Sequence, residues 1–362
     1  MASPSPTPAA PVAAVSDAAV DAYITQALAC FAAIAAPDRR LTARRTIAGH
    51  ALQMEFVGPA LADRLLPALA HHPEPTVATT DMHVHAWDLA STGALLPPPP
   101  WDAVPFTERG NVRAWDSERF SLSFDRRTDV FSAVDNQRRV GIYWTRDAEA
   151  LANYTTAAPM HRLLQGWLRA RGLFLFHAAS IGRPDGGMLL AGRSGSGKST
   201  TAALALASDL LYAGDDYALV EPQPSPRVHA LYSTTKLNLD TLESMPGLRA
   251  ALSNPESLGR EKALLFLADL FPQQLATQFP LRAIVLPRRS GQVESTARRV
   301  SPLVAYGTIG PDTAFTLLGD ARGTLAALKA LMQQVPCIEL LLGTDRQQLV
   351  RTLHAILDGQ VG

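Results

Sequence analysis

The chain has 362 residues, and 33 lysines and arginines balance 33 aspartates and glutamates, so its formal net charge is zero. This balance gives no sign of a nucleic-acid or polybasic membrane partner, and the 47% of hydrophobic residues excludes the disordered class. Two cysteines without a CxxC pattern indicate neither a disulfide framework nor a cysteine zinc site. We therefore expect a folded, cytoplasmic protein, with two domains by length.

The first half of the chain predicts a disordered tail and then an α+β domain. Residues 1–15 hold four prolines and no basic group, which is untypical of a signal peptide, and no 18-residue apolar window predicts a membrane span. Residues 16–72 are rich in alanine and leucine and predict two or three short helices. Alternating segments between 110 and 145 predict an antiparallel meander. We expect residues 16–150 to form an N-terminal domain that could recognise an acceptor.

The second half, residues 151–362, predicts an α/β domain. A helix is expected near Met160 to Leu168, ending close to Gly172. Apolar runs then predict strands, with a helix at 200–209 after the second of them, and the strands span 173–180, 187–192, 210–222, 227–233, 281–287 and 336–343. We expect an arginine-rich hairpin around 288–299 and helices after 310 that cover one face of the sheet.

A glycine-rich segment between an expected strand and helix matches the phosphate-loop pattern G-x-x-x-x-G-K-[ST]. In such a loop, backbone N–H groups converge on phosphate oxygens at a helix N-terminus. Lys198 would pair with the β and γ phosphates and the Ser199 hydroxyl would bind Mg²⁺. The expected ATP-binding residues are Gly192, Arg193, Ser194, Gly195, Ser196, Gly197, Lys198, Ser199 and Thr200.

Three further elements carry candidate catalytic groups. Asp215 and Asp216 end the next apolar run, sixteen and seventeen residues after Ser199, so a single helix can return them to the loop. Two adjacent carboxylates can divide the work of holding a metal and accepting a proton. His177 closes the preceding strand and can lie at the same end of the sheet. Lys236, one of only four lysines, follows a later strand and can neutralise phosphate charge.

The histidine in LFLFHAAS, the loop GRSGSGKS and the pair in LYAGDD together resemble the HPr kinase/phosphorylase family, which is related to phosphoenolpyruvate carboxykinase. The resemblance covers about 160–358 and implies a P-loop-containing, HPr-kinase-like C-terminal domain that uses ATP and Mg²⁺. It implies that Asp215 is the proton acceptor, that Asp216 helps Ser199 to hold Mg²⁺, and that His177 orients the base.

The chain departs from the family in one signature. The Glu-x-Arg-Gly segment associated with phosphorolysis is missing, and YSTTKLNLD with Lys236 occupies its place. In layout the chain is most similar to lasso-peptide precursor serine kinases. The expected function is that of a serine kinase acting on a peptide or small protein. The kinase itself could form a homo-oligomer. A metabolite kinase or carboxykinase-like enzyme, or an ATP-binding regulator without transfer activity, stays open.

Overall fold

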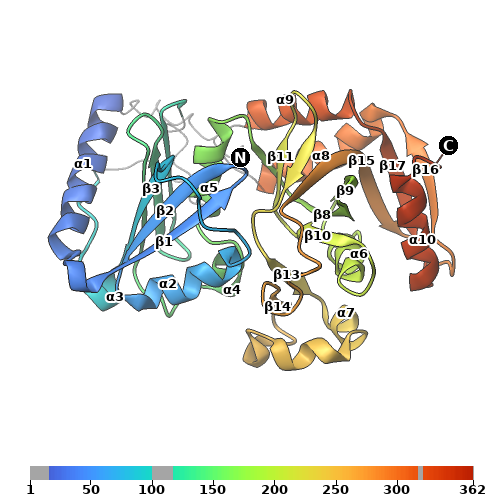
Figure 1. Ribbon diagram of the computed structural model, residues 1–362, viewed down its shortest axis with the longest axis horizontal. Coiled ribbons are helices and arrows are strands. Elements are labelled where there is room, and N and C mark those ends of the chain that lie inside the picture. Colours follow the sequence, from blue (N-terminus) through green and yellow to red (C-terminus); the bar gives the residue numbers. More distant parts are fainter. Residues whose placement is uncertain (1–15, 100–116, 317–320, 362) are drawn as a thin grey trace, which may run out of the picture.

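The structure is a computed structural model, and it describes residues 16–99, 117–316 and 321–361 (Figure 1). The chain has a mixed α/β architecture built on two large sheets, one from each half of the sequence. The expected tail at 1–15 and the segment at 112–116 that would begin the meander lie outside the described residues.

The first half builds a six-stranded mixed sheet in the order β1-β2-β3-β6-β5-β4. The expected meander is confirmed from residue 120 onward, because β4, β5 and β6 pair antiparallel in sequence order. The central β3 pairs parallel with both β2 and β6. The strands are β1 (Arg40–Ile47), β2 (His50–Val57), β3 (Met82–Asp88), β4 (Phe120–Asp125), β5 (Val130–Asp135) and β6 (Val140–Thr145).

The prediction of two or three short helices for 16–72 is wrong for residues 40–57, which form the antiparallel hairpin β1–β2. In β2, Leu52, Met54 and Phe56 are fully buried while Gln53 and Glu55 are partly exposed. This alternation has the two-residue period of a strand, and the high alanine and leucine content of the region concealed it.

Helices cover both faces of the first sheet. α1 packs Val20, Tyr23, Ile24 and Phe31 onto one face. α5 packs on the other, and its Gly166 approaches Ser121 so closely that a Cβ there would lie 2.6 Å from the serine Cβ. The helical segments are α1 (Asp17–Ile34), α2 (Pro59–Leu65), α3 (Leu89–Thr92), α4 (Asn153–Ala157) and α5 (His161–Arg169), with 3-10 turns at Pro37–Arg39 and Leu66–Leu69.

By length and composition alone, α1 could cross a membrane, although no such segment was expected from the sequence. In the structure 28% of this helix is buried. Its buried residues contact β3, β5 and β6. The helix therefore contributes a side of the hydrophobic core of the first half.

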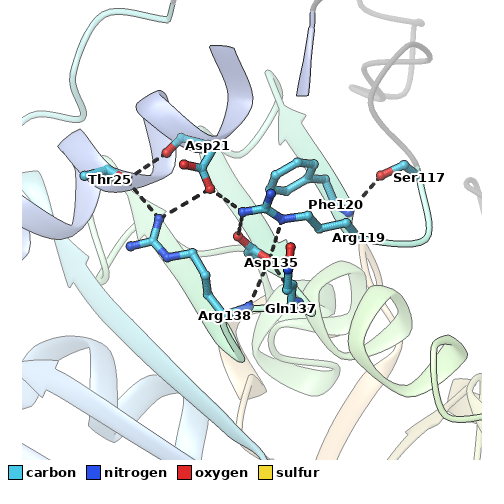
Figure 2. Close-up of polar contacts among 8 residues, drawn as sticks. All are labelled: Asp21, Thr25, Ser117, Arg119, Phe120, Asp135, Gln137 and Arg138. Atoms are coloured by element: carbon cyan, nitrogen blue, oxygen red, sulfur yellow. Dashed lines mark hydrogen bonds and ion pairs between the residues drawn. The ribbon is translucent and has the colours of Figure 1, made fainter. Parts of the chain in front are cut away.

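An ionic network ties α1 to the sheet (Figure 2). The Arg119 guanidinium contacts Asp21 of α1 and donates to the buried Asp135 carboxylate, at 2.8 Å from Nη2 and 3.1 Å from Nε. The backbone amides of Gln137 and Arg138 also donate to Asp135, at 3.0 and 3.1 Å. Burial opposes ionisation of Asp135, but these donors hold its pKa below the usual value.

The second half builds a nine-stranded mixed sheet. The long β15 lies at its centre and pairs parallel with β9 on one side and with β17 on the other. A two-stranded sheet, β13–β14, stands apart. The strands are β7 (Phe174–Phe176), β8 (Ala178–Arg183), β9 (Gly186–Ala191), β10 (Leu211–Gly214), β11 (Ala218–Glu221), β12 (Arg227–His229), β13 (Thr234–Leu237), β14 (Ala263–Phe266), β15 (Gln278–Arg289), β16 (Thr296–Val300) and β17 (Cys337–Leu342).

Two expectations for the end of the chain are wrong. The arginine-rich segments do not form a hairpin, because β17 inserts between β15 and β16 and pairs with both. The last helices do not share one face, since α6 and α10 join one core cluster whereas α8 and α9 join another across the sheet. The helical segments are α6 (Lys198–Ala205), α7 (Leu239–Glu243), α8 (Pro302–Thr316), α9 (Ala321–Met332) and α10 (Arg346–Leu357), with 3-10 turns at Pro246–Ala251 and Pro255–Ser257.

The two halves share a hydrophobic core. Trp167 of α5, together with strands of the first sheet, lies in the same buried cluster as Leu175, Leu219 and Tyr232 of the second half. The Tyr232 hydroxyl donates to the Pro159 carbonyl at 2.9 Å across this junction. The halves are therefore packed against each other through apolar side chains.

Candidate functional site

The glycine-rich loop lies where the sequence places it, between β9 and α6. β9 is fully buried and enters from the middle of the second sheet, and α6 begins at Lys198. Gly197, the N-cap, has φ +108° and lies against Leu342 of β17, where a Cβ would come within 2.3 Å of the leucine Cδ1. Only glycine fits this backbone conformation and this close approach.

Within the loop, Arg193, Ser194 and Gly195 are exposed at the tip. Lys198 is buried, and its Nζ donates back to the Gly192 carbonyl at 2.5 Å and to the Arg193 carbonyl at 3.3 Å. The lysine ammonium therefore lies under the loop. Two further residues of the motif meet neighbouring groups: the hydroxyls of Thr200 and Thr241 are 3.0 Å apart, and Ser199 contacts Asp215.

The structure brings the first of the two carboxylates directly to this loop. The Ser199 hydroxyl donates to Asp215 Oδ1 at 3.0 Å, and the Asp216 amide donates to the same oxygen at 3.0 Å. The Thr235 hydroxyl donates to the other oxygen, Oδ2, at 3.4 Å. Asp215 is buried, with 4% of its surface exposed. The spacing of sixteen residues thus returns the chain through α6 and β10 to the start of the helix.

The second carboxylate meets the two other candidate residues. Asp216 has φ +64°, and this left-handed turn directs its side chain differently from that of Asp215. Its Oδ2 lies 2.5 Å from Lys236 Nζ, and its Oδ1 lies 3.6 Å from His177 Nε2. Lys236 comes from β13 of the small sheet and His177 from the break between β7 and β8, so two segments distant in sequence meet the Asp216 carboxylate.

His177 lies where the expected strand 173–180 is divided into β7 and β8. β7 pairs with β11, whereas β8 pairs with β9 and β10, so the chain changes partners at this residue. The two aspartates lie between β10 and β11. Because β10 pairs with β8 and β11 pairs with β7, the break that contains His177 lies next to the aspartates.

The two carboxylates have opposite electrostatic environments. Burial and the neighbouring Asp216 charge raise the pKa of Asp215 to about 6, although the Ser199 hydrogen bond opposes the rise. For Asp216 burial also favours the neutral form, but His177 and Lys236 outweigh it and hold its pKa below the usual value. Burial lowers the pKa of Lys236, and the facing Asp216 carboxylate more than compensates. Asp216 and Lys236 therefore form an ion pair beside a carboxyl group that ionises less readily.

Sequence reasoning missed Thr235 and Tyr217. Thr235 precedes Lys236 in β13 and contacts Asp215. Tyr217 follows the aspartates, its amide donates to the Asp215 carbonyl at 2.8 Å, and its ring stacks on His161 at 5.4 Å between centroids. A threonine next to a candidate lysine and a tyrosine next to an acidic pair are available signals, but only the pairing of distant strands shows what they contact.

No protein-family model matches this chain, and no curated protein sequence matches it. Among the solved structures to which it is similar is the HPr(Ser) kinase/phosphatase from Coxiella burnetii, with 8% sequence identity and a TM-score of 0.28. That match covers 51% of this chain and 88% of the other.

Proposed function

We propose that this protein is an ATP- and Mg²⁺-dependent serine kinase with a P-loop-containing, HPr-kinase-like C-terminal domain. The observation that carries the proposal is the 3.0 Å contact between Ser199, at the end of the glycine-rich loop, and Asp215, with the Asp216–Lys236 pair beside it. A phosphate loop and a pair of carboxylates at one end of a sheet form the basic equipment for phosphoryl transfer.

The loop supplies the groups that a triphosphate needs. The amino end of α6 adds partial positive charge, and Lys198 can exchange its contacts with loop carbonyls for phosphate oxygens. The Ser196 hydroxyl is buried and meets no hydrogen-bond partner among the residues that the structure describes. A phosphate oxygen in the loop would give this donor a partner, which supports the assignment.

The oxygen atoms of Ser199 and Asp215 suit Mg²⁺, which prefers hard oxygen ligands and binds through one or two carboxylates and substrate phosphates. Within 16–99, 117–316 and 321–361 no three His, Cys, Asp or Glu side chains lie together as a metal cage. A magnesium site completed by substrate phosphates does not need such a cage. When bound, Mg²⁺ would neutralise charge on the β and γ phosphates. We assign Asp215 to this role together with Ser199, because Asp216 faces away toward His177 and Lys236.

We assign Asp216 the role of binding and orienting the hydroxyl group of the phosphoryl acceptor. Its carboxylate is held by Lys236 at 2.5 Å and faces His177 at 3.6 Å, so it can receive a hydrogen bond from an incoming serine hydroxyl and orient it for in-line attack. Lys236 would also face the transferring phosphoryl group. These roles reverse those that the family resemblance implies for the two aspartates.

We propose a peptide or small protein, such as a ribosomal peptide precursor, as the acceptor. The phosphorolysis signature is missing, and the chain has a large first half beside the site. A metabolite kinase is the second candidate, favoured by a pocket of about 290 Å³ next to Tyr217 that can hold a small molecule. An ATP-binding regulator would bind nucleotide and transfer nothing.

The test of the function uses the full chain with radiolabelled [γ-³²P]ATP, Mg²⁺, an array of serine peptides and a pool of hydroxylated metabolites. Lys198→Ala should abolish labelling and weaken ATP binding at least 10-fold in calorimetry, whereas the exposed Lys329→Ala of α9 should change neither. Labelling of metabolites only would establish the second candidate. ATP binding without any labelling would establish the regulator, and absence of ATP binding would refute the whole proposal.

The roles of the two aspartates are separated by their amide variants. Asp215→Asn should remove the Mg²⁺ dependence of ATP affinity, because one metal ligand loses its charge. Asp216→Asn should keep Mg²⁺-dependent ATP affinity and slow transfer at saturating ATP by about 100-fold or more. The reverse pattern would return the roles to those implied by the resemblance.

A further inference from the structure

The pocket next to Tyr217 lies beside the site and is lined by residues from both halves of the chain. Its volume is about 290 Å³, and it opens between the face of the β4–β6 meander and the helices α4 and α5. Hydroxyl groups dominate its lining, from Ser123, Ser132 and Tyr143 of the sheet and Thr155 of α4. Seven further charged or polar residues complete a lining that is unusual for the inner face of a sheet covered by helices.

The strand register explains the row of hydroxyls. Ser123 of β4 is directly opposite Ser132 of β5, and Ser132 is directly opposite Tyr143 of β6. The alternate positions on these strands, including Leu122, face α1 on the other side of the sheet. The chain thus places three hydroxyls in a line on the one face that borders the pocket.

One of these hydroxyls is an orphan. Tyr143 has 1% of its surface exposed, and its hydroxyl meets no hydrogen-bond partner among the residues that the structure describes. Leaving a buried hydroxyl unpaired costs about 1–3 kcal/mol. A polar ligand in the pocket would remove this cost, so Tyr143 is the observation that points to an occupant.

The charges in the lining indicate which kind of occupant. Arg127 and Arg162 supply two positive charges and Asp125 supplies one negative charge, which leaves one net positive charge. Burial lowers the pKa of His161 to about 3, so this ring is neutral. α5 begins at the pocket with Met160 and His161, and Met160 provides no side-chain cap, so the helix dipole adds positive potential. The pocket favours a group with negative charge.

The pocket leads to the catalytic groups through Tyr217. This residue lines the pocket and also lines a small hollow together with Asp215, Asp216 and Lys236. A hydroxyl that reaches past the Tyr217 ring arrives at Asp216, whose carboxylate is the proposed hydrogen-bond acceptor. The pocket is thus placed on the side of Asp216 from which an acceptor can approach.

We infer that this pocket holds the phosphoryl acceptor and selects one that carries an anionic group close to its hydroxyl. The inference rests on the proposed kinase function. The negatively charged group would contact Arg162 and the amino end of α5, the Tyr143 hydroxyl would donate to it or to a neighbouring oxygen, and the hydroxyl to be phosphorylated would lie at Asp216. The same chemistry could come from an acidic serine peptide or from a small hydroxy acid.

Binding is measured first without nucleotide, so that the result does not depend on phosphoryl transfer. The probes are Ac-Glu-Ser-Glu-NH₂, Ac-Lys-Ser-Lys-NH₂, D-glycerate and glycerol, titrated into the full chain with ligand-observed NMR. We expect at least one of the two acidic probes to bind at least 10-fold more tightly than its basic or neutral counterpart. Whichever acidic probe binds more tightly identifies the source, peptide or small molecule.

Two matched pairs of variants locate the binding. Arg162→Gln should weaken binding of the acidic probe at least 10-fold, whereas Arg169→Gln, two turns along the same helix, should not. Tyr143→Phe should weaken binding about threefold, whereas Tyr306→Phe, in α8, should not. Labelling with [γ-³²P]ATP should then follow the same order.

Equal binding of acidic and basic probes, or unchanged binding in Arg162→Gln, would overturn the inference. If the acidic probe binds in an Arg162-dependent way but is never labelled while ATP binds, the pocket is real and the kinase function fails. If labelling of an acceptor occurs but is insensitive to Arg162→Gln and Tyr143→Phe, the kinase function holds and the acceptor enters elsewhere.

Discussion

The ion pair between Asp216 and Lys236 allows the site to be tested through stability. Asp216→Asn removes the carboxylate charge and keeps the left-handed backbone at φ +64°, which asparagine tolerates well. The change therefore isolates electrostatics from backbone conformation. Alanine tolerates that conformation less well, so Asp216→Ala should lower the free energy of unfolding by about 1 kcal/mol more than Asp216→Asn does.

The magnitude follows from the geometry. Two unit charges 2.5 Å apart attract by about 7 kcal/mol at an effective dielectric constant of about 20, and desolvation of both ions offsets most of this. Breaking a fully buried pair costs about 3–5 kcal/mol. Here the side chains remain 18% and 25% exposed, and Asp215 still faces Lys236, so we expect Asp216→Asn to lower the free energy of unfolding by about 2 kcal/mol.

The assay is a double-mutant cycle in urea, with Lys236→Met as the second change. Because Lys236→Met removes the charge that Asp216→Asn leaves without its partner, the double variant should be more stable than the sum of the two single losses predicts, by at least about 1.5 kcal/mol. A coupling free energy below about 0.5 kcal/mol would refute the assignment of this pair as the electrostatic centre of the site.

Three further predictions concern the loop, the ionic network and the shared core. Gly197→Ala should weaken ATP binding at least 10-fold in calorimetry, because its Cβ would meet Leu342 at 2.3 Å, and an unchanged affinity would contradict the loop geometry. Asp135→Asn should lower the free energy of unfolding by about 3 kcal/mol at pH 7. Since the folded pKa of Asp135 is depressed, its stabilisation is present above the unfolded value of 3.8 and is lost as pH falls through the folded value. The difference between wild type and variant in urea should therefore shrink below about pH 4, unlike that of Asp63→Asn, a change at an exposed residue of α2. Deleting residues 1–150 should leave a chain without a cooperative thermal transition, because the second half would expose its part of the shared core.

Much of the second half could be predicted from the sequence because its signals are local. A buried apolar run, a glycine-rich turn and an alanine-rich helix follow one another in β9, the loop and α6, and each is determined by neighbouring residues. The spacing between Ser199 and the acidic pair is one helix and one strand long, so chain connectivity alone returns Asp215 to the loop. The meander at 120–145 was predictable for the same reason, from its two-residue alternation.

What only the tertiary structure decided is which distant segments meet. The insertion of β17 between β15 and β16, and the placement of α9 and α10 on opposite faces, depend on sheet pairing that no local pattern encodes. The left-handed turn at Asp216 separates two adjacent carboxylates, so that one meets Ser199 and the other meets Lys236. The hydroxyl-lined pocket has the same origin, because strand register aligns Ser123, Ser132 and Tyr143, and packing of the two halves brings that row to Tyr217. Sequence determined the chemical groups of this site, and long-range packing determined their partners, since side chains far apart in the chain interact only after the core has fixed their positions.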